Sequence, residues 1–270
     1  MSFIARLSQC WRLLMTGMCF ALFGVGGLLL SLVWFNLLLL AVRHNNTRRR
    51  IARRSISLSF RFFLRVAKLT GALDYHIEGA ALLRQDQGCL VVANHPTLID
   101  YVLIASVMPE TDCLVKSALL KNPFISGVIR AADYLVNSQA DALLPQSQRR
   151  LAQGDTLLIF PEGTRTRPGE SMSLQRGAAN IAVRCQCDLR VVTIRCSERL
   201  LDKQSKWYNV PPAKPRFTVT VGERLSITDY YDAKTQEPAL AARQLNRHLL
   251  NKLQNVETPL SGINDARALP

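Results

Sequence analysis

The stretch CLVVANHPTLID, residues 89–100, joins a short apolar run to a polar turn. The run Cys89–Ala93 does not alternate with polar residues, which is typical of a strand buried on both faces of a parallel sheet. The turn after it holds His95, one of four histidines in the chain, and Asp100. Ligands of open α/β sheets bind outside the carboxyl ends of the strands. This stretch therefore predicts an α/β fold with a functional site at the end of the strand.

The rest of the chain extends this pattern. Two more unalternated apolar runs, Thr156–Phe160 and Leu189–Ile194, follow the first, and helical patterns lie between the runs. This order predicts a mainly parallel sheet flanked by helices. The alternating segment Arg216–Gly222 is predicted to be an edge or half-exposed strand. Helices are predicted at Asp100–Val107, Asn122–Ala132, Ala142–Gln153, Leu174–Arg184 and Pro238–Gln254.

An uncharged apolar segment, Leu13–Val42, precedes this domain. A membrane span needs about 20 residues, whereas the core of a signal peptide has only about 7–15. We expect a retained membrane element, either a single helix or, with a bend at Gly24–Gly27, a helical hairpin. Two arginines precede the segment and six follow it before residue 55. This asymmetry predicts that the folded domain lies on the cytoplasmic side.

The formal net charge of +14 requires an acidic partner. The densest basic cluster, Arg48–Arg54, directly follows the apolar segment, where anionic lipids attract each basic residue by about 1 kcal/mol. Membrane lipid explains this charge more simply than nucleic acid, so we expect no nucleic-acid partner. The next segment, Ser55–Leu69, has helical amphipathic spacing and fits either a surface-lying helix or an ordinary packed one.

Four regions follow from these patterns. They are an anchor with its basic flank (1–54), a connecting helix (55–74), the main domain (75–256) and a loose tail (257–270). The seven cysteines show no paired metal-ligand spacing, which indicates reduced thiols and no metal site.

His95 and Asp100 have the chemistry of a general base and its orienting carboxylate. Pro96 keeps His95 out of the helical conformation, so His95 is expected off the helix end, with Asp100 about one turn inside. A carboxylate on one imidazole nitrogen fixes the tautomer and stabilises the imidazolium. The spacing alone also fits a capping histidine beside an unrelated aspartate.

A second polar turn, PEGTRTRPG at residues 161–169, follows the run Thr156–Phe160. If the two strands are parallel neighbours, both turns converge on one site. Gly163 permits close approach of a ligand. Arg165 suits a phosphate or carboxylate, and Glu162 suits a substrate hydroxyl or Arg165 itself. A surface turn with a solvated ion pair is the alternative for this turn alone.

Together the two turns resemble a known family. NHPTLID and IFPEGTRT (residues 159–166) match the histidine–four-residues–aspartate and Phe-Pro-Glu-Gly-Thr-Arg motifs of the lysophosphatidic-acid acyltransferase-like (glycerolipid acyltransferase) family. The resemblance implies that family's fold, and acyl transfer from acyl-CoA or acyl carrier protein to a lipid hydroxyl through a ternary complex. It implies that His95 is the base and that Asp100 orients it. The substrate-binding residues implied are Asn94, Glu162, Gly163, Thr164 and Arg165.

The acceptor pocket departs from the family pattern. Ser138 stands where the resemblance places a phosphate-binding arginine, and Arg190 and Thr193 stand at proline positions of a later block. The altered pocket is expected around Ser138, Lys116 and Arg176. A further segment, Leu200–Pro212, is similar to acyltransferases of bacterial aryl-polyene lipid biosynthesis, which implies a specialised envelope lipid with a non-phosphate acceptor. Trp207 and Tyr208 also fit an interfacial aromatic pair.

The resemblance and the charge asymmetry together predict an enzyme of the bacterial inner membrane, facing the cytoplasm. Its expected partners are membrane lipids and an acyl-CoA or acyl carrier protein donor, and no cofactor is expected. Two alternatives use the same fold. One is a thioesterase or esterase, in which water replaces the acceptor hydroxyl, and the other is a non-catalytic lipid-binding protein.

Overall fold

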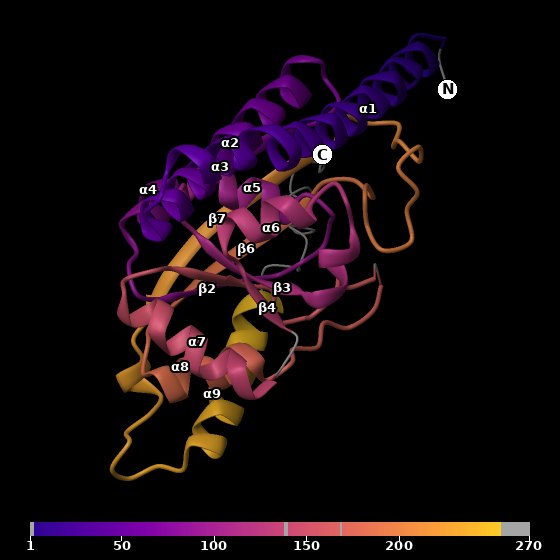
Figure 1. The fold of residues 1–270 in the computed structure, drawn as a ribbon. Helices are drawn as coiled ribbons and strands as arrows, with labels where there is room; N and C mark the ends of the chain where they lie inside the picture. The colour runs from indigo at the N-terminus through magenta and orange to yellow at the C-terminus, as the bar shows by residue number, and fades with distance from the viewer. Residues whose placement is uncertain (1–2, 138–139, 168, 255–270) are drawn as a thin grey trace, which may run out of the picture.

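A mixed, mostly parallel sheet forms the centre of the molecule (Figure 1). The computed structural model describes residues 3–137, 140–167 and 169–254, and within these ranges the sheet has seven strands in the order β1-β7-β6-β2-β5-β3-β4. Strand β7 is antiparallel to β6 and parallel to β1, and the other pairs are parallel. The strands are β1 (Asp74–Glu78), β2 (Leu90–Ala93), β3 (Asp112–Lys116), β4 (Leu135–Asn137), β5 (Leu157–Ile159), β6 (Leu189–Cys196) and β7 (Arg216–Leu225). The α/β prediction is confirmed.

Helices cover both faces of the sheet (Figure 1). Strand side chains alternate between two apolar cores, one under the N-terminal helices and one under the C-terminal helices. The first face carries α1 (Phe3–Leu29), α2 (Phe35–Ala41), α3 (Asn45–Leu69), α5 (Asp100–Val107) and α6 (Ser126–Ala132), and the second carries α7 (Ala140–Ala152), α8 (Gly177–Cys185) and α9 (Pro238–Gln254). A short helix, α4 (Ala80–Gln85), follows β1.

One strand lies elsewhere than expected. Arg216–Gly222 was predicted to be an edge or half-exposed strand, and it is half-exposed but not at an edge, because β7 is hydrogen-bonded to β1 on one side and β6 on the other. Its alternating pattern arises because Phe217, Val219 and Val221 pack into the core while the residues between them are less buried. The two edge strands are β1 and β4, and neither is predicted from the sequence.

The N-terminal apolar segment is one long helix. Helix α1 passes through Gly24–Gly27 without a break, and a π-helical turn at Leu30–Trp34 joins it to α2. Of the two predicted forms, the continuous helix is present and the bend at these glycines is not. A Cβ on Gly27 would lie 2.9 Å from the Phe124 carbonyl oxygen, so the glycine permits close packing. The chain reverses at residues 42–44, and α3 returns along α1, with Trp34 bonded to Ser55 and Trp11 to Thr70.

This helix lies along the domain instead of projecting from it. Among the described residues it is the one helix long and apolar enough to cross a membrane. Its inner face nevertheless packs on the domain for most of its length. Met15 belongs to the apolar core under the N-terminal helices, and Phe35 belongs to a further, smaller apolar cluster on that side. On its outer face Leu7, Leu14, Val25 and Leu32 are each more than half exposed. The apolar segment is thus part of the folded unit and presents an apolar stripe outward.

A buried ion pair fastens α3 to the sheet. Arg53 and Asp112 are both buried, their side chains meet at 2.7 Å, and Arg53 Nε donates to the Ala132 carbonyl. Burial raises the pKa of Asp112 to about 6, against the opposing effect of Arg53. Arg53 thus favours the charged form of this carboxylate. The basic cluster predicted to face lipid is thus divided, because Arg53 serves the interior while Arg50 and Arg54 remain exposed beside Glu110.

Replacing Arg53 by alanine should destabilise the fold by about 3 kcal/mol, because it strands a buried carboxylate. Arg54→Ala removes a solvent-exposed partner of Glu110 and should cost less than about 1 kcal/mol. Thermal unfolding of both variants in one detergent measures the difference. Equal melting temperatures for the two variants would contradict the assigned role of Arg53.

Candidate active site

The two polar turns meet at one edge of the sheet. Strands β2 and β5 are parallel neighbours with Val92 opposite Ile159, so the turns that follow them emerge side by side. The rings of His95 and Phe160 stack with centroids 4.4 Å apart. The expected convergence of the turns is therefore present in the structure.

His95 and Asp100 form a hydrogen-bonded pair. The His95 Nδ1 to Asp100 Oδ2 distance is 2.8 Å, and the Asp100 side chain is fully buried. Thr97 donates its backbone N–H to Oδ2 at 2.7 Å and its hydroxyl to Oδ1. An ionised carboxylate only accepts, so His95 carries its proton on Nδ1 and leaves Nε2 free to accept one. Helix α5 begins at Asp100 itself, not a turn earlier, which leaves His95 off the helix end.

The electrostatics of the pair follow from its burial. Loss of solvent raises the pKa of Asp100, and the hydrogen bonds from His95 and Thr97 oppose this rise. The three donors favour the charged form of this buried carboxylate. In that form it stabilises an imidazolium when Nε2 takes a proton.

Glu162 holds the histidine from the second turn. Its Oε1 accepts the backbone N–H of His95 at 2.6 Å, and its Oε2 accepts the hydroxyl of Thr166. The carboxylate is buried. The sequence predicts a substrate-binding role, whereas both oxygens have partners within the protein, so Glu162 acts here as a positioning residue for His95.

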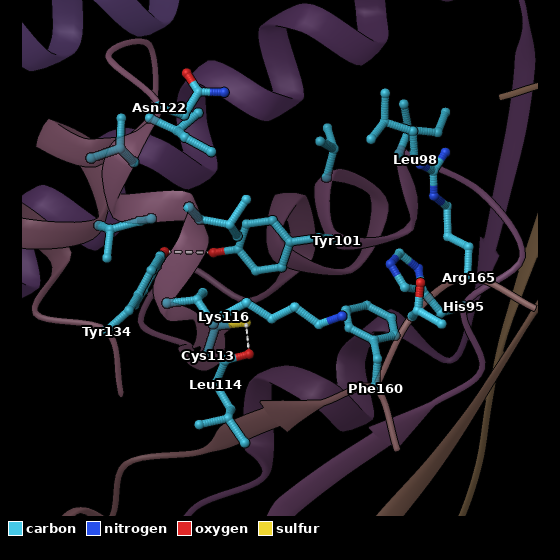
Figure 2. A pocket seen from close by; sticks show the side chains of 18 of the residues that line it. His95, Leu98, Tyr101, Cys113, Leu114, Lys116, Asn122, Tyr134, Phe160 and Arg165 are labelled. Atoms are coloured by element: carbon cyan, nitrogen blue, oxygen red, sulfur yellow. Dashed lines mark hydrogen bonds between the residues drawn. The ribbon is translucent and has the colours of Figure 1, made fainter. Parts of the chain in front are cut away.

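The rest of this turn is built around Gly163 and Arg165. Gly163 has φ +70°, in the left-handed region that glycine adopts without strain. Thr164 is exposed and lines the cavity beside His95. Arg165 donates from one nitrogen to the carbonyls of Leu201 and Asp202, each at 2.9 Å. Its guanidinium lies above His95 (Figure 2).

Leu201 is a residue of the site that no sequence pattern indicated. Its carbonyl accepts the backbone N–H of Leu98, from the first turn, as well as Arg165 from the second. Its φ of +55° is unusual for leucine and strained. No sequence motif identifies this residue, because it contributes only its backbone carbonyl.

The structure places the other predicted site residues in different positions relative to the cavity. Asn94 is buried and exchanges two hydrogen bonds with the backbone of Ile194, so it ties β2 to β6 and does not face a ligand. Lys116 is exposed at the end of β3, lines the cavity and extends toward Phe160 (Figure 2). Arg176 is exposed just before α8 and is not among the lining residues. Ser138 lies outside the described residues.

The proline-position residues do not shape this site. Arg190 lies at the start of β6, at the opposite end of the strand from the turns, and binds both oxygens of Asp86 at 2.7 and 2.8 Å. It neutralises a buried carboxylate. Thr193 is buried within β6. The expectation that Arg190 alters the acceptor pocket is therefore wrong.

A large apolar cavity opens beside His95. Its volume is about 1350 Å³, and it extends between the sheet and α1. Its lining includes Phe20, Phe60, Phe63 and Phe124. Deeper in, the hydroxyls of Tyr101 and Tyr134 are bonded at 2.6 Å (Figure 2). A general base at the mouth of an apolar cavity suits chemistry on the polar end of a long apolar molecule.

No cluster of three or more histidine, cysteine, aspartate or glutamate side chains suited to a metal occurs among the described residues.

Comparisons with known proteins match most of this domain. Residues 74–197 match the family model described as Acyltransferase. This segment of the chain is similar to that family. The matched range contains β1 to β6 and both turns of the site.

Curated relatives are lysophosphatidic-acid-type acyltransferases. The chain is 21% identical over 154 residues to human 1-acyl-sn-glycerol-3-phosphate acyltransferase beta, covering 54% of this chain and 55% of that one. It is 27% identical over 122 residues to the Helicobacter pylori 1-acyl-sn-glycerol-3-phosphate acyltransferase, covering 43% and 52%. The chain thus spans about half the length of these relatives.

The fold has a solved counterpart. The crystal structure of the 1-acyl-sn-glycerophosphate acyltransferase PlsC from Thermotoga maritima superposes with a TM-score of 0.65 at 20% identity, covering 92% of this chain and 98% of that one. The matched part of the fold is therefore larger than the segment 74–197 alone.

Glu162→Ala should lower kcat about 10- to 100-fold, because a displacement of His95 by about 1 Å costs rates of this order. Glu162→Gln should retain activity within a few-fold, since its amide oxygen still accepts the His95 N–H. Glu170→Ala, an exposed carboxylate in the same turn, is the matched control. Steady-state acyl transfer checks all three, and equal losses in the glutamine and alanine variants would contradict a positioning role.

Proposed function

We propose that this protein is a membrane O-acyltransferase that transfers a fatty acyl group from acyl-CoA or acyl carrier protein to a lipid hydroxyl. The observation that carries the proposal is the hydrogen-bonded pair of a half-buried His95 and a fully buried Asp100 in the lining of the apolar cavity. The domain family and the fold support it.

The geometry supports a direct transfer. Nε2 of His95 takes the proton of the acceptor hydroxyl as its oxygen attacks the thioester carbonyl carbon. Asp100 stabilises the imidazolium. The tetrahedral intermediate then collapses, the carbon–sulfur bond breaks, and the thiolate leaves with the proton that His95 held. No residue is acylated, and the acyl chain occupies the apolar cavity.

The acceptor we favour is a lysophospholipid. Lys116 and Arg165 place two positive charges near His95, and both suit a phosphate. The relatives named above are 1-acylglycerol-3-phosphate acyltransferases. A specialised envelope lipid without a phosphate is the alternative acceptor.

We further propose that the protein acts at the cytoplasmic face of a bacterial inner membrane. The outward apolar stripe of α1 and α2 supports lipid contact. Because the inner face of the same helix is fastened to the domain, we infer that the helix lies within one leaflet, parallel to the surface.

His95→Ala and Asp100→Asn should each lower acyl transfer about 10²- to 10⁴-fold. The asparagine variant fails because its amide donates to Nδ1 and moves the imidazole proton to Nε2. His76→Ala, an exposed histidine of β1, is the matched control. Product analysis by mass spectrometry also separates transfer from hydrolysis, because free fatty acid without acylated lipid would contradict the proposal.

Lys116→Gln should raise KM about 10-fold or more for lysophosphatidic acid, since a charge-assisted contact contributes about 1.5–3 kcal/mol. It should leave KM for a monoacylglycerol, which has no phosphate, unchanged. Lys121→Gln, exposed and outside the cavity lining, is the control. Faster turnover of monoacylglycerol than of lysophosphatidic acid by the unaltered protein would favour the non-phosphate acceptor.

A further inference from the structure

The loop between β6 and β7, residues 197–215, contains the aromatic pair that the site does not use. Its inner part is buried, with Leu200 and Leu201 lining the cavity beside His95. Asp202 is also buried and accepts the backbone N–H groups of Gln204 and Ser205. The loop is therefore fixed at its base, and residues 203–209 project as its tip.

The loop is fastened to the apolar helix α1. Arg12 is a buried arginine that donates to the carbonyls of Pro211 and Pro212, and Gln9 donates to the carbonyl of Val210. A Cβ added to Gly17 would lie 3.4 Å from the ring of Trp207, so the ring lies beside this glycine of α1. These contacts hold the tip beside the outward apolar stripe of α1.

The chemistry of the tip is that of a membrane–water boundary. Trp207 and Tyr208 are each 48% exposed, and their rings meet edge to face with centroids 5.7 Å apart. Lys203 and Lys206 are exposed, and the sequence KQSKWYN of the tip has no acidic residue. Amphipathic aromatic rings concentrate at headgroup level, and adjacent lysines attract anionic lipid.

We propose that residues 203–208 form a docking surface for an anionic lipid bilayer, with Trp207 and Tyr208 at headgroup level. The proposal rests on the membrane location proposed above. The argument is the continuity of the tip with the apolar face of α1 together with its uncompensated positive charge. Because the same loop supplies the Leu201 carbonyl to both turns of the site, this docking sets the height of the cavity mouth above the lipid.

Depth-dependent quenching of Trp207 fluorescence tests the proposal. Trp11→Phe and Trp34→Phe leave Trp207 as the single tryptophan in the full chain, which is reconstituted in vesicles of phosphatidylcholine and phosphatidylglycerol at 7:3. Lipids with a nitroxide at the 5-position should quench Trp207 at least twofold more than lipids labelled at the 12-position. Should the double variant fail to fold, the difference between the unaltered protein and Trp207→Phe gives the same quantity.

An aqueous reference comes from the opposite face of the sheet. Lys234 is exposed in the segment before α9, so Lys234→Trp in a background without other tryptophans should not be quenched. Quenching of Trp207 no stronger than that of the Lys234→Trp reference would overturn the proposal.

Charge is tested in the same assay. Removing phosphatidylglycerol should reduce the shallow quenching, and Lys203→Gln with Lys206→Gln should abolish this lipid dependence, while Lys234→Gln should preserve it. Trp207 quenching that depends neither on the phosphatidylglycerol content nor on Lys203 and Lys206 would overturn the assignment of an anionic lipid surface. No acyl transfer is measured, so an inactive enzyme with a quenched Trp207 would contradict the proposed function alone.

Discussion

The carboxylate of Glu162 on the backbone N–H of His95 is the contact on which the site depends. It joins the turn after β2 to the turn after β5, and it is available only because those strands are parallel neighbours in a fixed register. A slip of one residue would turn every side chain of the strand to the other face. With the backbone held from one side and the ring held by Asp100 from the other, His95 keeps one orientation and one tautomer before any substrate binds.

How much the sequence predicts depends on the kind of signal each element carries. Strands β2 and β5 are fully buried, and α9 has a clear apolar face, so all three were found, α9 with its observed bounds. Strands β1, β3 and β4 were not predicted because they are short, polar or half-buried, and only pairing with neighbours makes them strands. The His95–Asp100 pair was recognised from its motif, but the role of Glu162 was not, because a backbone partner 67 residues away leaves no local trace.

The arginines show the same limit of sequence-based prediction, because their ion-pair partners lie far away in the sequence. The basic cluster after the apolar segment is predicted to face lipid from its charge alone. Within that cluster, however, Arg53 forms an ion pair with the buried Asp112. At the far end of the sheet, Arg190 forms an ion pair with Asp86. Net charge says nothing about which cations are already paired. Among the exposed positive charges, Lys116 in the cavity lining and Lys203 and Lys206 on the loop tip are distinguished by their position beside the cavity and the apolar helix.

The central claim is that His95 is held as a neutral base with its proton on Nδ1. Nitrogen-15 NMR of the histidine-labelled protein measures this directly, since the chain has only four histidines to assign. We predict that near neutral pH the His95 signals show a protonated Nδ1, with a downfield proton shared with Asp100, and an unprotonated Nε2. In Asp100→Asn the proton should move to Nε2. A proton on Nε2 in the unaltered protein would contradict the account.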